Sequence, residues 1–202
     1  MSVAGNVATK AVHFFAVPGF ADWEAAHTLA ELRRHCHYDV QVVGLSRQAI
    51  QSMGGVIVQP TCSLEEVDPT QVAIFILSGG DRWEQQPLDK ELADVLTRLD
   101  DHQVPLAAIC AATTAIVRAG LIRGRRHTSN GLEYLKKQVP NYTDAALYAD
   151  APAVRDRGLI TASGLADVEF AQEIMAELAV LSEEGRAYWT KLFRGGRLQA
   201  GS

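Results

Sequence analysis

Cys110 is the residue whose type and surroundings most clearly offer chemistry, because it stands between an apolar run and a helix-like segment. The residues two before and two after it, Ala108 and Ala112, are small, as a sharp strand-to-helix nucleophile elbow requires. An elbow places the sulfur over the amino end of a helix, where unpaired N–H groups favour a thiolate and predict a pKa well below about 8.5. A buried structural cysteine in an alanine-rich strand end fits the same spacing equally well.

Gly79 and Gly80 follow another apolar run, residues 72–77. Glycines after a neighbouring strand let the backbone come close to a ligand and aim an amide N–H at developing negative charge. The amides of Gly80 and Ala111 are therefore the expected donors of an oxyanion hole. A simple turn also accounts for a Gly-Gly pair, so the pair alone does not decide between the two interpretations.

The elements that must hold these residues alternate between strands and helices. The apolar runs predict main strands at 11–17, 39–45, 72–77 and 106–109, and shorter strands at 145–149, 153–155 and 159–162. Helical spacing predicts helices at 23–36, 88–99, 111–119, 132–138 and 168–181. This alternation predicts an α/β fold with a mostly parallel sheet and helices on both faces. Chemistry in such sheets gathers at the carboxyl ends of the strands, here the loops 18–24, 78–84 and 110–112.

The bulk composition predicts one domain. With 202 residues, of which 48% are hydrophobic, the chain can bury a continuous core without disulfides or metals. We expect a loose lead-in at 1–10, a single domain at 11–194 and a frayed tail at 195–202. The three cysteines show no C-x-x-C and no metal-ligand spacing. We therefore expect no metal, no cofactor and a reducing, cytoplasmic location.

The charge pattern argues against two classes of partner. The net charge is −5, with a pI of about 5.7, so neither nucleic acid nor an anionic membrane would meet a broad basic field. The short cluster Arg123, Arg125 and Arg126 is read as a solvated loop. The uncharged stretch 104–117 is too short and too polar to span a bilayer.

Several segments together resemble the ThiJ/PfpI superfamily, which has a class I glutamine amidotransferase-like fold. They occur in the family's order and spacing between about residues 11 and 181: Phe20-Ala21-Asp22-Trp23-Glu24, Leu77-Ser78-Gly79-Gly80, Ala107-Ala108-Ile109-Cys110, Ala119-Gly120-Leu121-Ile122-Arg123-Gly124-Arg125 and Leu159-Ile160-Thr161-Ala162-Ser163. The resemblance implies a flavodoxin-like three-layer sandwich with the nucleophile elbow after the fourth main strand.

By that resemblance Cys110 is the nucleophile and Glu24 is the acid that reaches over it from the first loop. A carboxylic acid beside a thiolate donates a hydrogen bond only if it carries a proton, and the neighbouring negative charge raises its pKa. Without the resemblance, Glu24 reads as a solvated glutamate in the first turn of a helix, where the helix dipole favours it.

The chain departs from the family at the histidines. Peptidase-like members look to use a histidine directly after the cysteine, where this chain has Ala111. The histidine of other members falls on Asn130, which can orient a substrate but cannot shuttle a proton at neutral pH. His127 lies three residues earlier, an odd number along a strand, and is expected to face the other way.

Two further residues are pocket candidates. Glu84 falls where peptidase-like members look to place an acid shared with a neighbouring subunit. Trp83 either walls the pocket or is a rim aromatic without a role. The resemblance also implies a homodimer, with the segment 188–193 and Trp83 as candidate contacts.

The favoured function is an enzyme that acts on small electrophiles. Cys110 would attack a carbonyl or carbon–nitrogen carbon while Glu24 passes a proton, as in glyoxalase-like, deglycase-like or isocyanide-hydratase-like hydration. The alternative is a stress protein that senses oxidation, in which Glu24 stabilises a sulfinic acid on Cys110. Ala111 disfavours a PfpI-type peptidase, and the lack of a histidine in the expected place disfavours an amidotransferase.

Overall fold

The computed structural model describes residues 10–34 and 38–195. A seven-stranded sheet has the order β5-β2-β1-β6-β7-β9-β8, and β3 and β4 form a separate hairpin. The strands are β1 (Ala11–Phe15), β2 (Val40–Gly44), β3 (Ile50–Gln51), β4 (Ile57–Val58), β5 (Cys62–Ser63), β6 (Val72–Leu77), β7 (Leu106–Ile109), β8 (Ala153–Asp156) and β9 (Leu159–Ala162). Within the large sheet only β8 runs antiparallel to its neighbour. The predicted mostly parallel sheet is confirmed.

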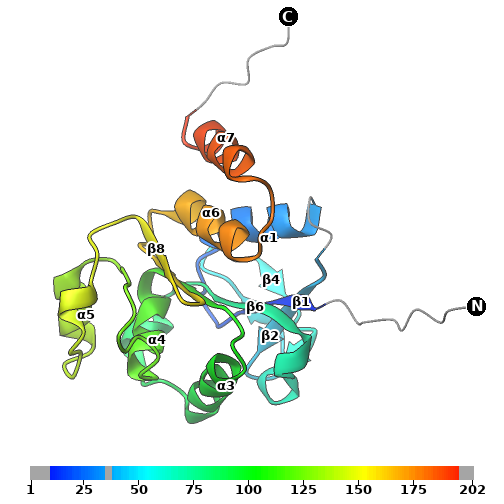
Figure 1. Cartoon of the computed structure of the whole chain (residues 1–202). Helices are drawn as coiled ribbons and strands as arrows, with labels where there is room; N and C mark the ends of the chain where they lie inside the picture. Colours follow the sequence, from blue (N-terminus) through cyan, green and yellow to red (C-terminus); the bar gives the residue numbers. More distant parts are fainter. Residues whose placement is uncertain (1–9, 35–37, 196–202) are drawn as a thin grey trace, which may run out of the picture.

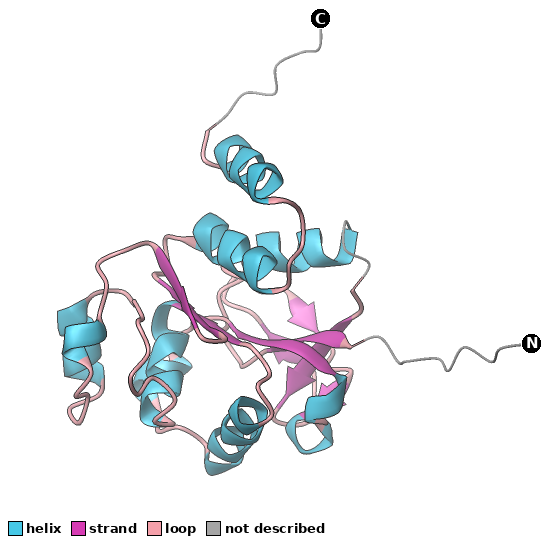
Figure 2. Cartoon of the chain, in the orientation of Figure 1, coloured by secondary structure: helices cyan, strands magenta, loops and turns pink. Residues whose placement is uncertain are grey.

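Helices cover both faces of this sheet (Figures 1 and 2). They are α1 (Ala26–Arg34), α2 (Arg82–Gln85), α3 (Lys90–Asp101), α4 (Thr113–Arg118), α5 (Leu132–Gln138), α6 (Asp167–Glu177) and α7 (Glu183–Phe193). Helices α1 and α6 pack together on one face, with α7 stacked outside α6, while α3 and α4 lie on the other face. This is the three-layer sandwich that the resemblance implied.

The central strand β6 explains why the site is rigid. All six of its residues are buried, because helices cover both faces of a parallel sheet and an unbroken apolar run is stable only there. Its neighbours β1 and β7 are also almost wholly buried. The carboxyl ends of these three strands lie side by side, and each leads into one of the loops that the sequence predicts to carry chemistry.

Most predicted elements are present with bounds that shift by a few residues, such as the helix predicted at 168–181, which ends at Glu177, and two segments differ in kind. Residues 145–149 were expected to form a strand, but they contain a 3₁₀ helix, η4 (Ala145–Leu147), and a single bridge between Tyr148 and His127. The sheet already ends at β8, so this segment has no strand beside which to extend. Residues 183–193 are expected to lie in a polar tail, but they form helix α7, which is capped by Ser182, whose hydroxyl accepts from the N–H of Gly185.

The predicted lead-in at 1–10 and the tail at 195–202 lie almost wholly outside the described residues. In the described ranges, no helix has both the length and the apolar character needed to cross a membrane.

Candidate active site

The predicted elbow is present at the end of β7. Cys110 opens a 3₁₀ turn, η3 (Cys110–Ala112), and has a left-handed backbone with a φ of 60°. A residue with a side chain adopts this conformation at a cost of about 1–2 kcal/mol, which the surrounding fold must offset. The hydroxyl of Thr113 helps by donating to the carbonyl of Cys110 at 2.7 Å. Ala108 and Ala112 are fully buried, as the small-residue pattern predicts.

Glu24 reaches the elbow from the loop before α1. It is only 1% exposed, which excludes the solvated first-turn glutamate. Its Oε2 accepts hydrogen bonds from the N–H of Gly79 at 2.5 Å and from the hydroxyl of Ser78 at 3.2 Å. The loops are joined further by the N–H of Ala21, which donates to the carbonyl of Gly79 at 3.0 Å. The loops 18–24 and 78–84 therefore hold the carboxyl group in place.

The side chains of Glu24 and Cys110 are hydrogen-bonded to each other. Burial raises the pKa of Glu24, although the N–H of Gly79 opposes the effect. Burial, followed by the negative charge of Glu24, raises the pKa of Cys110 to about 11, against the N–H of Ala111 and the amide of Asn130. The predicted pKa well below about 8.5 is therefore wrong, because burial and the facing carboxylate outweigh the lowering by main-chain N–H groups. Between the two pKa values the pair carries one proton and one negative charge.

Asn130 contacts the sulfur directly. Its Nδ2 donates to the Sγ of Cys110 at 3.3 Å, and its Oδ1 accepts from the N–H of Gly164 at 2.9 Å. One side chain thus connects the elbow to the loop that follows β9. An amide supplies a fixed donor here but no transferable proton.

Two glycines enclose the cysteine. A Cβ on Gly79 would lie 2.8 Å from the Cβ of Cys110, and a Cβ on Gly164 would lie 2.7 Å from its Sγ. Neither contact is sterically possible, so any side chain at these positions would displace the sulfur. Gly79 was a predicted pocket residue, whereas Gly164 was missed. The signal was its place in the loop that follows β9, the strand next to β7.

The tryptophan at the mouth of the site is Trp23 rather than Trp83. Trp83 is 3% exposed, packs against Phe15 and donates from its indole N–H to the carbonyl of Ser78 at 2.8 Å. It supports the loop 78–84 from the core, so it neither lies at the rim nor offers a dimer contact. Trp23 is 48% exposed, and its indole N–H lies 3.4 Å from the carbonyl of Gly164.

The two remaining pocket candidates differ in position. His127 is fully buried and bonds through Nδ1 to the carbonyl of Arg125 at 2.8 Å and through Nε2 to the hydroxyl of Tyr142 at 2.5 Å. None of its contacts with described residues reaches Cys110, in line with the expected direction. Glu84 is exposed and accepts a hydrogen bond from the hydroxyl of Tyr134 at 2.9 Å. Burial and the hydrogen bond with Glu84 raise the pKa of Tyr134, and the negative charge of Cys110 raises it further. Tyr134, which the sequence does not single out, therefore lies near the site.

The two predicted oxyanion donors are not equivalent. The N–H of Ala111 already faces the sulfur of Cys110. Gly80 is buried with a φ of 151°, and its N–H has no acceptor among the described residues. Any side chain on Gly80 would collide with the carbonyl oxygen of Gly19, 2.7 Å from its Cβ position. Within the described ranges, no group of His, Cys, Asp and Glu side chains is arranged to hold a metal ion.

Comparisons with known proteins agree on one family. The sequence profile of the DJ-1/PfpI family matches residues 10–177. The protein named "uncharacterized protease YoaZ" of Bacillus subtilis is 34% identical over 194 residues, covering 91% of this chain and 90% of that protein. Deglycase TK1284 of Thermococcus kodakarensis is 26% identical over 141 residues, covering 69% of this chain and 84% of that protein. The crystal structure of the DJ-1 superfamily protein Atu0886 from Agrobacterium tumefaciens has a TM-score of 0.84 at 32% identity, covering 92% of this chain and 97% of that one.

Proposed function

Because the chain belongs to the DJ-1/PfpI family, we propose that it is a cofactor-independent enzyme in which Cys110 adds to a small electrophile. One observation carries the proposal: an almost fully buried carboxyl group, that of Glu24, is hydrogen-bonded to the thiol at the elbow. A carboxylate with a raised pKa is a suitable base for this thiol, and once protonated it is a suitable acid.

The first step needs only these two side chains. As the sulfur of Cys110 bonds to the carbonyl carbon, its proton passes to the carboxylate of Glu24. The electron pair of the C=O bond moves to oxygen, where the N–H of Gly80 is the proposed donor. Glu24 then returns the proton to that oxygen and leaves a neutral thiohemiacetal. Atoms and charges balance without an oxidant or a cofactor.

A 2-oxoaldehyde is the electrophile that fits this pair best. In its thiohemiacetal the second carbonyl makes the former aldehyde C–H acidic. Glu24 takes that proton and returns it to the second carbon, while the hydroxyl proton passes to the oxygen of the second carbonyl, which leaves a thioester and a new hydroxyl group. Water then releases a hydroxy acid and regenerates the thiol of Cys110. The name of the deglycase relative supports carbonyl chemistry in the family. Hydration of an isocyanide needs the same nucleophile and proton carrier, so both substrates belong in the test.

The other two functions receive less support from the site. Peptide hydrolysis needs a base that also protonates the leaving amine, but the positions of the family histidines hold Ala111 and Asn130. An oxidation sensor depends on a thiolate, whereas a pKa of about 11 keeps Cys110 as a thiol at neutral pH.

Turnover of methylglyoxal and of a simple alkyl isocyanide tests the proposal. We expect the wild type to consume at least one of them and Cys110→Ser to lose essentially all activity. Cys62→Ser is the matched control, because Cys62 lies on edge strand β5 and its pKa is raised mainly by burial. Equal, background-level consumption by the wild type and Cys110→Ser would remove the enzymatic function.

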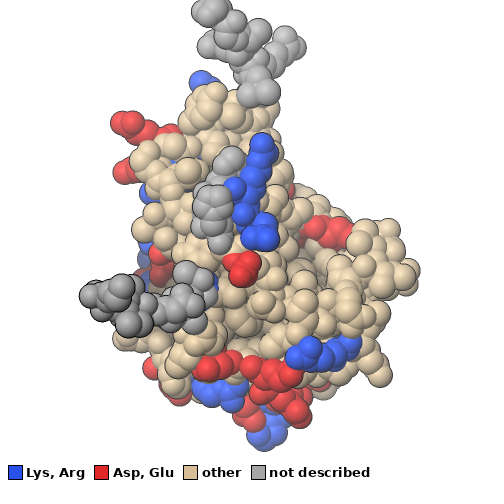
Figure 3. All heavy atoms as spheres, turned by 90° about the vertical axis from the view of Figure 1, so that its right-hand side faces the viewer, with Lys and Arg blue, Asp and Glu red and all other residues tan. Residues whose placement is uncertain are grey.

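The partners proposed with this function are the electrophile and a second copy of the chain. Tyr188 and Phe193 are exposed on α7 by 61% and 47%, which leaves them free for a dimer contact. The face in Figure 3 mixes acidic and basic side chains and has no broad basic field, which supports the exclusion of nucleic acid. We propose a single domain at 11–194 that acts in the cytoplasm as a homodimer. Light scattering should then give the mass of two chains, and a mass of one chain contradicts the dimer.

A further inference from the structure

A cavity of about 520 Å³ lies next to residues that contact the cysteine, although Cys110 itself does not line it. Asn130 lines this cavity and donates to the sulfur of Cys110. Ser163 also lines it, directly before the Gly164 that packs on the sulfur. The cavity therefore shares a wall with the nucleophile, and its volume is within the range of small-molecule sites, about 300–1,000 Å³.

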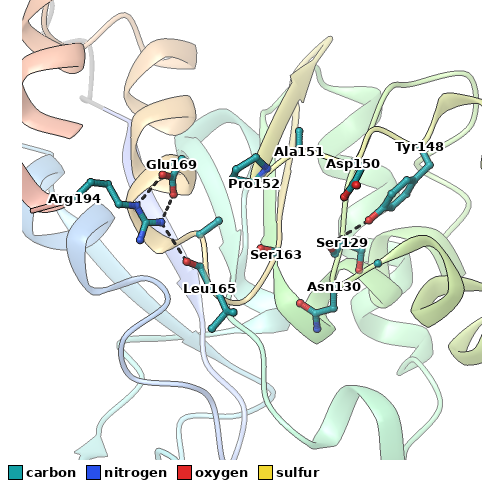
Figure 4. A pocket seen from close by; sticks show the side chains of 12 residues that line it. Ser129, Asn130, Tyr148, Asp150, Ala151, Pro152, Ser163, Leu165, Glu169 and Arg194 are labelled. Carbon is teal, nitrogen blue, oxygen red and sulfur yellow. Dashed lines mark hydrogen bonds and ion pairs between the residues drawn. The ribbon is translucent and has the colours of Figure 1, made fainter. Parts of the chain in front are cut away.

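One wall of the cavity has no net charge. Arg194, at the end of α7, donates from Nε to Glu169 at 2.8 Å and from NH2 to the carbonyl of Leu165 at 3.1 Å. Figure 4 shows these three residues grouped at one side of the cavity. Because its guanidinium is paired with a carboxylate of α6, Arg194 is a poor anchor for an anionic ligand.

The opposite wall carries an unpaired negative charge. Asp150 lines the cavity across from Arg194 and forms no ion pair within the described residues (Figure 4). Beside it, Tyr148 presents an aromatic ring and holds its hydroxyl 3.4 Å from the carbonyl of Ser129. A carboxylate next to an aromatic ring attracts a cation through both its charge and the ring quadrupole.

We propose that this cavity is a substrate subsite for a cationic ammonium group, carried by an electrophile whose aldehyde carbon bonds to Cys110. The ammonium group lies against Asp150 and Tyr148, and the aliphatic link to the aldehyde passes Asn130, which lines the cavity and contacts the sulfur of Cys110. The proposal rests on the proposed addition of Cys110 to a carbonyl and names the class of substrate. The bond changes are those of the first step above, since the cation takes no part in them.

Two isosteric pairs of probes separate charge from shape. Choline and 3,3-dimethylbutan-1-ol differ only in a quaternary nitrogen against a quaternary carbon, and neither reacts with a thiol. Binding to the wild-type chain is measured by NMR titration. We expect choline to bind about three- to ten-fold more tightly and Asp150→Asn to abolish the difference, the size expected of an exposed charge contact. Asp101→Asn, an exposed aspartate at the end of α3, is the matched control and should keep the difference.

The second pair tests the connection to the sulfur. Betaine aldehyde should slow the alkylation of Cys110 by iodoacetamide more than 3,3-dimethylbutanal does, and Asp150→Asn should weaken the protection by betaine aldehyde while leaving that by 3,3-dimethylbutanal unchanged. Neither readout needs turnover, so preference for the cation with no consumption of methylglyoxal removes the proposed function but keeps the subsite. Equal binding of choline and its neutral isostere, or protection of Cys110 by betaine aldehyde that Asp150→Asn leaves unchanged, overturns the subsite even if methylglyoxal is consumed.

Discussion

The carboxyl group of Glu24 is hydrogen-bonded to the thiol of Cys110 while a main-chain N–H, that of Gly79, holds its Oε2 from the other side. The two side chains come from different loops at one edge of the sheet. Burial raises the pKa of both, and the negative charge of Glu24 raises that of Cys110 further, while the hydrogen bond with Cys110 lowers that of Glu24. Removing one partner must therefore change the behaviour of the other, and the change can be measured without knowing the substrate.

Replacing Glu24 by glutamine is expected to make Cys110 more reactive to alkylation. Glu24→Gln removes the negative charge that helps raise the pKa of Cys110 to about 11, so the thiolate fraction at pH 8 increases. We expect iodoacetamide to label Cys110 roughly five- to ten-fold faster, as read by mass spectrometry of each cysteine. Turnover of methylglyoxal should fall in the same variant, because glutamine carries no transferable proton. Unchanged labelling would mean that the two groups are not coupled.

The same substitution is expected to stabilise the fold in a pH-dependent way. The folded pKa of Glu24 is raised above its unfolded value, so its contribution to stability is fully present below about pH 4.5 and is lost as pH rises through the folded pKa. In urea unfolding, the free energy of unfolding of Glu24→Gln should therefore equal that of the wild type near pH 4 and exceed it increasingly as the pH rises to 8. The exposed Glu65→Gln is the control and should show no such difference. A gain independent of pH would contradict the raised pKa.

Gly164 is expected to tolerate no side chain. The Cβ of Gly164→Ala would lie 2.7 Å from the sulfur and 3.4 Å from Oε1 of Glu24, so the nucleophile must move. A displacement of about 1 Å at a reacting atom costs about 100-fold in rate, and we expect a loss of that size in methylglyoxal turnover. Gly185→Ala on α7, whose Cβ would lie 3.3 Å from the hydroxyl of Ser182, should remain near the wild-type rate. Full activity of Gly164→Ala would show that the loop yields without cost.

The sheet and the elbow follow from local patterns in the sequence. The apolar runs at β6 and β7 match the structure residue for residue, because a strand buried on both faces can contain little else. Helix α7 was overlooked although Ser182 and the acidic residues after it form a helix start, because Trp189 is the only buried residue on a mainly polar helix.

The chemistry of the site was harder to predict, because it depends on contacts between distant segments. Burial of Trp83 and exposure of Trp23 result from how two loops pack on the core, which residue type does not reveal. The contact of Gly164 with the sulfur depends on the order of β7 and β9 in the sheet. The pKa of Cys110 was predicted from the helix alone, whereas burial and Glu24, both tertiary effects, determine it.

Asn130 is expected to set how Cys110 responds to pH. Asn130→Asp keeps an oxygen for the N–H of Gly164 but replaces the donor to the sulfur with a second negative charge. The pKa of Cys110 should rise further, and methylglyoxal turnover should fall by about 10²–10³, the usual effect of losing one positioned donor. Asn141→Asp, an exposed asparagine outside the site, is the control.

Asn130→His tests the same position in the opposite direction. Its imidazole would keep a donor to the sulfur of Cys110 and add a group that titrates near pH 6.5, so the pH–rate profile should gain a limb there. The wild-type profile should show only the limb of Glu24, because Glu24 is its only proposed proton carrier. If Asn130→Asp matched the wild type in rate and Asn130→His left the profile unchanged, the amide would be a spacer between two loops, with no influence on the sulfur.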